Sequence, residues 1–164
     1  MNPTERGDLA VLYAEVDAEI ADKNPRCDVS GRCCRFSEYG HTLFLSAIEA
    51  ELLFETPPDH SAGQVGECPY QIAGRCTARD RRPLGCRIYF CDPNYAEPMV
   101  ELSESSIRRL KGLHDRWERA WDYRPLQRFL ADRTTIGSEV SNRGNPLTII
   151  TSDVRQLDSS RCGD

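Results

Sequence analysis

Two cysteine-rich stretches decide how this chain folds, CDVSGRCC at residues 27–34 and CPYQIAGRCTARDRRPLGCRIYFC at residues 68–91. Between them they carry seven of the eight cysteines: Cys27, Cys33, Cys34, Cys68, Cys76, Cys86 and Cys91. Free thiols at this density would be an oxidation hazard, because thiolates react readily with oxidants and with disulfides. The spacing therefore predicts that these sulfurs are bonded to one another or to a metal.

Several features favour metal over disulfides. The first twenty residues lack the basic start and the long apolar run of a signal peptide, because acidic residues interrupt them. No stretch reaches the roughly 18 apolar residues that are needed to span a bilayer. We therefore expect a cytoplasmic protein, a setting in which stable disulfides are rare. Disulfides or small buried hydrophobic cysteines are the structural alternative.

The composition indicates one domain with a thin hydrophobic core. The chain has 164 residues, of which 39% are hydrophobic and 29% are charged. The first fraction is slightly low and the second slightly high for a globular protein, so a bound metal would help to hold the fold. The net charge of -5 provides no basic surface for nucleic acid or for an anionic membrane. We predict neither of these partners.

A helix is predicted before the first cysteine. Asn2 is a suitable cap, Pro3 suits the first helical position, and Glu5 completes the capping pattern. Apolar residues then recur at helical spacing, so the helix is predicted over 3–23 and ends before Asn24 and the proline that follows it.

Between the two cysteine-rich stretches, and within the second of them, the predicted elements are shorter than this first helix. Residues 41–45 look extended, and Ser46 to Glu49 is a second capping box, whose helix the prolines at 57–58 must end. From 68 to 98 the chain has no sustained period, which is typical of a loop ordered by what its side chains bind. Within it, residues 87–90 are predicted to form a short strand.

The sequence after residue 98 indicates a second helical region. An apolar stripe from Ile107 to Trp121 indicates a long helix over 103–131, which Pro125 breaks or restarts, and we expect it to pack on the N-terminal helix. The fold class is therefore mainly α, a small single domain over 1–133 with helices around an irregular, metal-stapled loop region. Residues 134–164 are interpreted as a tail that is loosely attached or forms one short strand near 147–150, with a free thiol at Cys162.

Local residues suit a thiolate site. Gly31 lets the backbone turn sharply between Cys27 and the adjacent pair Cys33 and Cys34, and a disulfide between adjacent cysteines is strained. The second stretch carries an excess of three positive charges, which would stabilise a negatively charged metal–thiolate centre or simply form a solvated face. The residues are Arg75, Arg79, Arg81, Arg82 and Arg87 against Asp80 and Asp92.

In order and spacing, the two stretches resemble the YkgJ-like cysteine-cluster family, which is described as zinc- or iron-chelating. The family pattern CxxCxxCC, CP, GRC and RPxxCRxFxC reads here CDVSGRCC, CPYQIAGRC and RPLGCRIYFC. Ser30 stands where the family has its second cysteine. The resemblance implies metal ligation by the seven cysteines named above. Some flagellin lysine methylases are similar in this region, which implies iron–sulfur chemistry.

Other residues have weaker claims to the site. His41 follows the first stretch closely enough to serve as a nitrogen ligand, although a structural role is the simpler interpretation. His60 has a still weaker claim, and His114 is most simply a flank of the helical packing stripe. Nearby aromatic rings are expected to shield the sulfurs from water. These rings are Phe36, Tyr70, Tyr89 and Phe90.

Two classes of function follow from the sequence. In the first, the chain is a small metal-binding protein that chelates a zinc ion or an iron–sulfur cluster. In the second, an iron–sulfur cluster supports electron transfer or modification of a protein partner, by a methylase-like enzyme or its accessory. Both centres take four thiolates, so counting ligands does not separate them. The sequence shows no catalytic triad, phosphate-binding loop or general acid–base pair, and it leaves open whether the chain is an enzyme.

Overall fold

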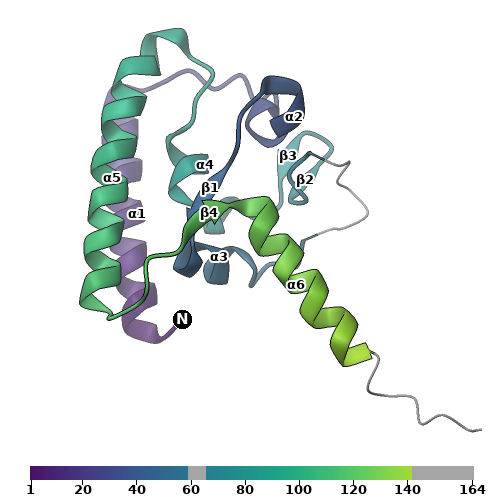
Figure 1. Ribbon diagram of the computed structural model, residues 1–164. Helices are drawn as coiled ribbons and strands as arrows, with labels where there is room; N and C mark the ends of the chain where they lie inside the picture. The colour runs from purple at the N-terminus through teal and green to yellow at the C-terminus, as the bar shows by residue number, and fades with distance from the viewer. Residues whose placement is uncertain (59–65, 142–164) are drawn as a thin grey trace, which may run out of the picture. The chain divides into compact units, whose positions relative to one another are not determined.

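The computed structural model describes residues 1–58 and 66–141, and the fold in that part of the chain is mainly α, as predicted (Figure 1). Short 3-10 turns span Arg32–Cys34, Arg79–Arg81 and Pro93–Tyr95. No helix among the described residues is long and apolar enough to cross a membrane. The helices and strands are α1 (Pro3–Lys23), α2 (Phe36–Tyr39), β1 (Phe44–Ser46), α3 (Ala47–Leu53), β2 (Gln71–Ile72), β3 (Arg75–Cys76), α4 (Leu84–Ile88), α5 (Ala96–Arg116), β4 (Tyr123–Pro125) and α6 (Leu126–Ser141).

The first helix has the predicted bounds because its caps are encoded locally. The Asn2 side chain accepts a hydrogen bond from Glu5 N at 2.9 Å, and Glu5 Oε2 accepts from Asn2 N at 2.7 Å. This reciprocal pair satisfies two backbone donors that the helix itself leaves unpaired. At the other end, Asn24 adopts a left-handed conformation with φ of 45°, which closes the helix before Pro25.

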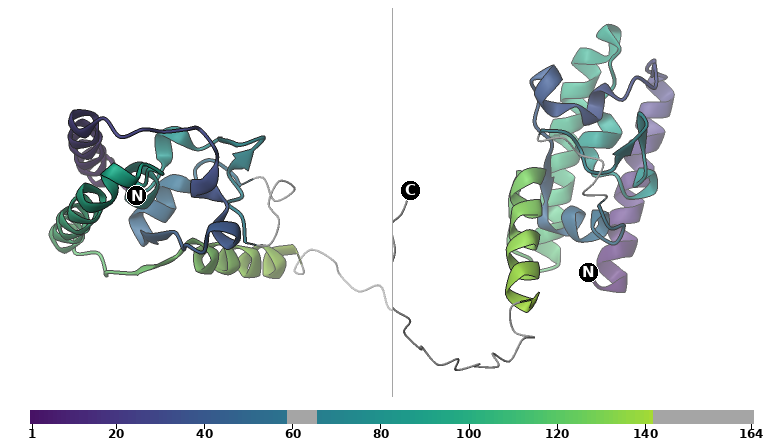
Figure 2. Two further views of the ribbon diagram at one scale, coloured as in Figure 1. Left: turned by 90° about the horizontal axis from the view of Figure 1, so that it is seen from above. Right: turned by 90° about the vertical axis from the view of Figure 1, so that its right-hand side faces the viewer.

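Helices α1 and α5 pack antiparallel, as Figures 1 and 2 show from different sides. Ion pairs along the seam give the direction, because Asp8 faces Arg116 near one end while Glu19 faces Arg109 nearer the other. The apolar faces of both helices form one core, which confirms the predicted packing of the two. Its buried members on these helices are Leu9, Leu12, Tyr13, Val16, Ile20, Leu102, Leu110 and Leu113. Helix α5 begins at Ala96, earlier than predicted, and ends at Arg116, so Trp121 lies beyond it.

Strands β1 and β4 pair antiparallel, with Leu45 opposite Arg124, and each leads directly into a helix. The predicted capping box at Ser46 and Glu49 is present at the start of α3. Helix α3 ends at Leu53, before the prolines, because the N–H groups of Glu55 and Thr56 bond only three residues back, at 3.3 and 3.2 Å. These bonds tighten the last turn into 3-10 geometry, so the bonds between residues four apart that would continue the α-helix do not form.

The predicted strand at 87–90 is wrong, because Leu84–Ile88 forms the short helix α4. The N–H of Leu84 donates to Glu49 Oε1 at 2.8 Å, so a carboxylate from α3 satisfies a free donor at the first turn of α4. Glu49 lies 35 positions away in the sequence. A local pattern could not have revealed this stabilisation.

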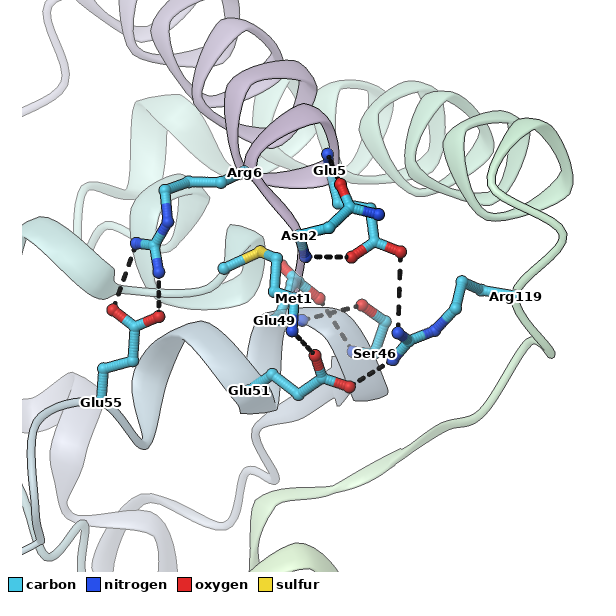
Figure 3. A network of polar contacts seen from close by, with 9 residues as sticks. All are labelled: Met1, Asn2, Glu5, Arg6, Ser46, Glu49, Glu51, Glu55 and Arg119. Atoms are coloured by element: carbon cyan, nitrogen blue, oxygen red, sulfur yellow. Dashed lines mark hydrogen bonds and ion pairs between the residues drawn. The ribbon is translucent and has the colours of Figure 1, made fainter.

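A polar network ties the start of α1 to α3 and to the segment after α5 (Figure 3). Arg119 pairs with Glu5 at 3.6 Å and also with Glu51, and the amino group of Met1 lies 2.7 Å from Glu51. Arg6 forms a two-armed pair with Glu55 at the end of α3. These contacts fix α3, and with it the segment that carries Glu49, against the helical core.

The chain divides into two compact units, Met1–Ala131 and Asp132–Asp164. The predicted domain boundary at 133 falls inside α6, because residues 132–141 continue the helix that starts at Leu126. In the second unit only this helical end is described. The predicted strand near 147–150, His60 and Cys162 lie outside the described residues.

His114 is a buried imidazole whose charge is expected to make stability depend on pH. It is fully buried on α5, with its ring 5.8 Å from that of Trp117 and 5.0 Å from that of Trp121. Burial lowers the pKa of His114 and outweighs a hydrogen bond with the Ala120 backbone, which raises it. The charge of Arg119 lowers the pKa further, and the raising influences of Asp115 and Glu5 are weaker. Its contribution to stability is therefore complete above the unfolded pKa of about 6.5 and is lost as the pH falls towards the folded pKa.

We expect the free energy of unfolding of the native chain to fall between pH 7.5 and pH 5.5. In His114→Leu this fall should be smaller, because the variant lacks the imidazole that takes up a proton when the chain unfolds at low pH. Urea unfolding followed by circular dichroism measures both quantities. An identical pH dependence in the two proteins would contradict the assignment to His114.

Candidate metal centre

Five of the seven predicted cysteines gather in one hydrophobic cluster, which we call the sulfur cluster: Cys33, Cys34, Cys68, Cys76 and Cys86. Cys34 and Cys68 are 7% and 6% exposed, and the other three are partly exposed. All seven cysteines in the described part of the chain are free thiols. Residues from both cysteine-rich stretches therefore meet in space, although up to 53 positions separate them (86 − 33).

Backbone contacts hold the two stretches together. The N–H of Cys68 donates to the carbonyl of Cys34 at 2.8 Å, and the Gln71 side chain donates to the carbonyl of Gly31 at 3.0 Å. Gly31 has φ of 70°, and a Cβ at this position would lie 2.4 Å from Gln71 Nε2. The predicted sharp turn is thus present, and only glycine fits it without displacing Gln71. Gln71 pairs in turn with Cys76 across the β2–β3 hairpin.

The sulfurs lie close enough to perturb one another. Cys33 Sγ is 3.9 Å from Cys34 Sγ, and this contact, followed by burial, raises the pKa of Cys33. The same contact lowers the pKa of Cys34, but hydrogen bonding to Cys68 and burial outweigh it and bring that pKa to about 12. Burial, and then the charges of neighbouring sulfurs, raise the pKa of Cys86. Several thiolates cannot share this site without a cation to compensate their charge.

The predicted arginines divide into different roles. Arg82 is near enough to lower the pKa of Cys33 and of Cys86, although the burial and thiol effects are larger. Arg87 is instead 8% exposed and ties α4 to α1, because its guanidinium lies 2.6 Å from Asp17. Arg82 therefore acts on the sulfurs, whereas the ion pair of Arg87 joins two helices.

Cys27 and Cys91 lie outside the sulfur cluster, but their neighbours in the chain are hydrogen bonded to each other. The N–H of Arg26 donates to Asp92 Oδ2 at 3.0 Å, which joins the residues that adjoin these two cysteines. Burial, and then the charge of Cys91 and its hydrogen bond, raise the pKa of Tyr89. The first-stretch residue Cys27 is exposed.

The aromatic rings expected to shield the sulfurs do so unequally. Phe36 and Tyr70 are 4% and 1% exposed and belong to the same hydrophobic cluster as the sulfurs. Phe90 packs instead against the α1–α5 core, with its ring 5.6 Å from that of Tyr95. The sequence placed Phe90 at the site because it is close to the cysteines along the chain, but its side chain packs against the helical core.

His41 lies beside the sulfur cluster. Its Nε2 is 3.3 Å from the carbonyl oxygen of Cys33, and its ring stacks on Tyr89 at 5.3 Å and meets Phe36 edge-on at 5.4 Å. Its Nδ1 is buried and has no hydrogen-bond partner among the described residues. Ligation of a metal by His41 stays a prediction, and His114 lies in the helical core instead.

The donor set fits a soft metal ion, because all five members of the sulfur cluster are potential thiolates. Within residues 1–58 and 66–141, however, no three His, Cys, Asp or Glu side chains are arranged so that they could hold one metal ion. Side chains of the sulfur cluster would therefore have to rotate to close around an ion. The seven predicted ligands stay a prediction.

A cleft of about 240 Å³ adjoins the sulfur cluster. Outside the cysteine-rich stretches, the sequence had placed only Phe36 and His41 near the sulfurs. It missed the other lining residues, because they come from separate elements and share no motif. The cleft residues are Cys33, Phe36, His41, Thr42, Leu43, Phe44, Leu84, Gly85, Cys86, Ile88, Tyr89, Ser103, Ile107 and Tyr123. Cys33 and Cys86 belong to both the cleft and the sulfur cluster, so a molecule in the cleft would lie against the thiols.

Comparison with known proteins yields no relative: no protein-family model, curated protein or solved structure matches the chain. The resemblance to the YkgJ-like family therefore stays a prediction from the cysteine pattern.

Proposed function

We propose that this chain is a cysteine-cluster metal-binding protein that chelates zinc or an iron–sulfur centre through thiolates from its two Cys-rich stretches. The observation that supports the proposal best is the meeting of Cys33 and Cys34 with Cys68, Cys76 and Cys86 in one cluster. Five thiols exceed the four that either centre needs. The cysteine pattern that resembles the YkgJ-like family points to the same chemistry.

The electrostatics of the sulfur cluster support a bound cation. Burial and mutual repulsion keep the thiols protonated when no cation is present, as the raised pKa values of Cys33, Cys34 and Cys86 indicate. A divalent ion or an iron–sulfur cluster would replace these protons and compensate the thiolate charge. Arg82 would offset part of the remaining negative charge. We include a cytoplasmic location in the proposal, because thiolate ligands persist best in a reducing compartment.

A second candidate is an iron–sulfur-dependent redox protein, or a protein-modifying enzyme of the methylase-like kind or its accessory. The cleft favours it, because Cys33 and Cys86 face both the cleft and the other sulfurs. A molecule bound there would lie next to the metal centre, which a purely structural zinc site does not require.

Elemental analysis and the visible spectrum of protein purified without oxygen test the proposal. An iron–sulfur centre should give a brown protein with broad visible absorption and iron together with acid-labile sulfide. A zinc centre should give a colourless protein with stoichiometric zinc. Protein that contains neither metal, and that takes up neither zinc nor reconstituted iron and sulfide, would overturn the proposal.

A further inference from the structure

The cleft beside the sulfur cluster has the character of a small-molecule site. It is an open cleft whose walls come from several separate elements of the fold and from the loop before β1. Its volume of about 240 Å³ exceeds the roughly 150 Å³ that accommodates benzene in an apolar protein cavity. Apolar side chains line most of it and a few polar groups converge on it, as in ligand sites generally.

The lining selects against charged ligands. No Asp, Glu, Lys or Arg contributes to it among the described residues, so an ionised ligand would lose its hydration without gaining an ion pair. Burial raises the pKa of Tyr123 to about 12, so its phenol stays protonated and adds no charge to the lining. The site therefore suits a neutral molecule.

The walls favour a flat, aromatic shape. The His41 ring stacks on Tyr89 with 14° between the planes, and Phe44 stacks on Tyr123 with 25° between them. Aromatic rings pack favourably against such faces and edges, and cysteine sulfur is a soft, polarisable contact for a ring. Cys33 and Cys86 supply two such sulfurs.

His41 supplies the polar anchor. Its Nε2 lies 3.3 Å from the Cys33 carbonyl, which can only accept, so Nε2 carries the proton and Nδ1 is an acceptor. Nδ1 is buried without a partner in the described part of the chain, a state that costs free energy until a donor reaches it. His41 lines the cleft, so the ring must rotate to turn this buried acceptor towards a molecule bound there.

We propose that this cleft binds a small, neutral, planar aromatic molecule that carries one O–H or N–H donor, which it gives to His41 Nδ1. The proposal goes beyond metal binding and does not require it, because every contact comes from the protein itself. Where a metal centre is present, the same molecule would lie beside it, which makes it a candidate substrate for the second function above.

Phenol and anisole test the proposal, because both carry a planar ring but only phenol has an O–H donor. Binding to the full chain is measured by ligand-observed NMR titration, where a dissociation constant on the order of 1 mM is expected for so small a probe. Phenol should bind about fivefold more tightly than anisole, which corresponds to one hydrogen bond. In His41→Phe, which keeps a ring against Tyr89, this preference should disappear while anisole still binds.

A cleft-filling variant locates the binding. Ile107→Trp should abolish binding of both probes, whereas Val100→Trp places the same side chain at an exposed position of the same helix and should bind as the native chain does. Retained anisole binding in His41→Phe shows that this variant is folded. Failure of phenol to bind the native chain, equal affinity for both probes, or unchanged binding in Ile107→Trp would overturn the proposal. None of these outcomes bears on whether the cysteines bind metal.

Discussion

Glu49→Ala is expected to lower the free energy of unfolding by about 3–5 kcal/mol, because it leaves several buried donors without an acceptor. Glu49 is 1% exposed. It accepts hydrogen bonds from Leu84 N at 2.8 Å, Ser46 N at 2.8 Å and Tyr13 OH at 3.2 Å. These donors belong to the start of α4, the cap of α3 and the middle of α1, so one carboxylate joins three elements. Chemical denaturation measures the loss.

Two further variants make the comparison specific. Glu49→Gln keeps one carbonyl oxygen at this position and should cost clearly less than Glu49→Ala. Glu55→Ala removes a carboxylate that is 33% exposed and pairs with Arg6 and Arg81 at the surface, where solvent screens ion pairs, so it should cost far less than Glu49→Ala. If Glu49→Ala lowered the free energy of unfolding no more than Glu55→Ala does, the Glu49 carboxylate would not hold the three elements together.

Removal of one thiol from the sulfur cluster is the second change with a large expected effect. We expect Cys68→Ser or Cys86→Ser to lower bound metal to a minor fraction of that in the native chain, because a hydroxyl is a poor ligand for a soft metal ion. Small thiolate sites contribute on the order of 10 kcal/mol when metal binds, so the metal-dependent part of the stability should fall as well. Metal per chain after anaerobic purification measures the first effect, and thermal unfolding with and without a chelator measures the second.

The controls separate the sulfur cluster from the other cysteines. Cys162→Ser should leave the metal content unchanged. Cys27→Ser tests the placement of Cys27 outside the sulfur cluster, and it should reduce metal content far less than Cys68→Ser does. Equal metal content in the Cys68, Cys86 and Cys162 variants would reject the ligand assignment. A loss in Cys27→Ser as large as in Cys68→Ser would instead place Cys27 among the ligands.

Elements with local signals were predictable from the sequence. The bounds of α1 follow from Asn2, Pro3 and Glu5 at one end and from Asn24 at the other, because capping depends only on residues within one turn. The start of α3 at the Ser46 capping box and the start of α6 after Pro125 follow in the same way. The pairing of α1 with α5 was also predictable, since each carries an apolar stripe that must be buried.

Elements stabilised by distant residues were not predictable. Residues 87–90 suggested a strand, but Glu49 binds the Leu84 N–H and favours the helix α4, and no local pattern contains a partner 35 positions away. The candidate site likewise has features that the sequence predicted and features that it did not. The cysteine spacing identified the candidate thiols, but it could not separate the sulfur cluster from Cys27 and Cys91 or foresee the cleft, whose walls include Ser103 and Ile107 of α5.

The sequence alone therefore determined the mainly α class, the capped ends of α1, the capped start of α3 and the seven candidate thiols, because each depends on residue types at short spacing. Only the tertiary structure decided which thiols meet, that Arg87 pairs with Asp17 of α1, and that His41 lines the cleft while it contacts the Cys33 carbonyl. Those outcomes depend on contacts between segments far apart in the chain. Such contacts are set by packing and by buried hydrogen bonds, which local residue patterns do not specify.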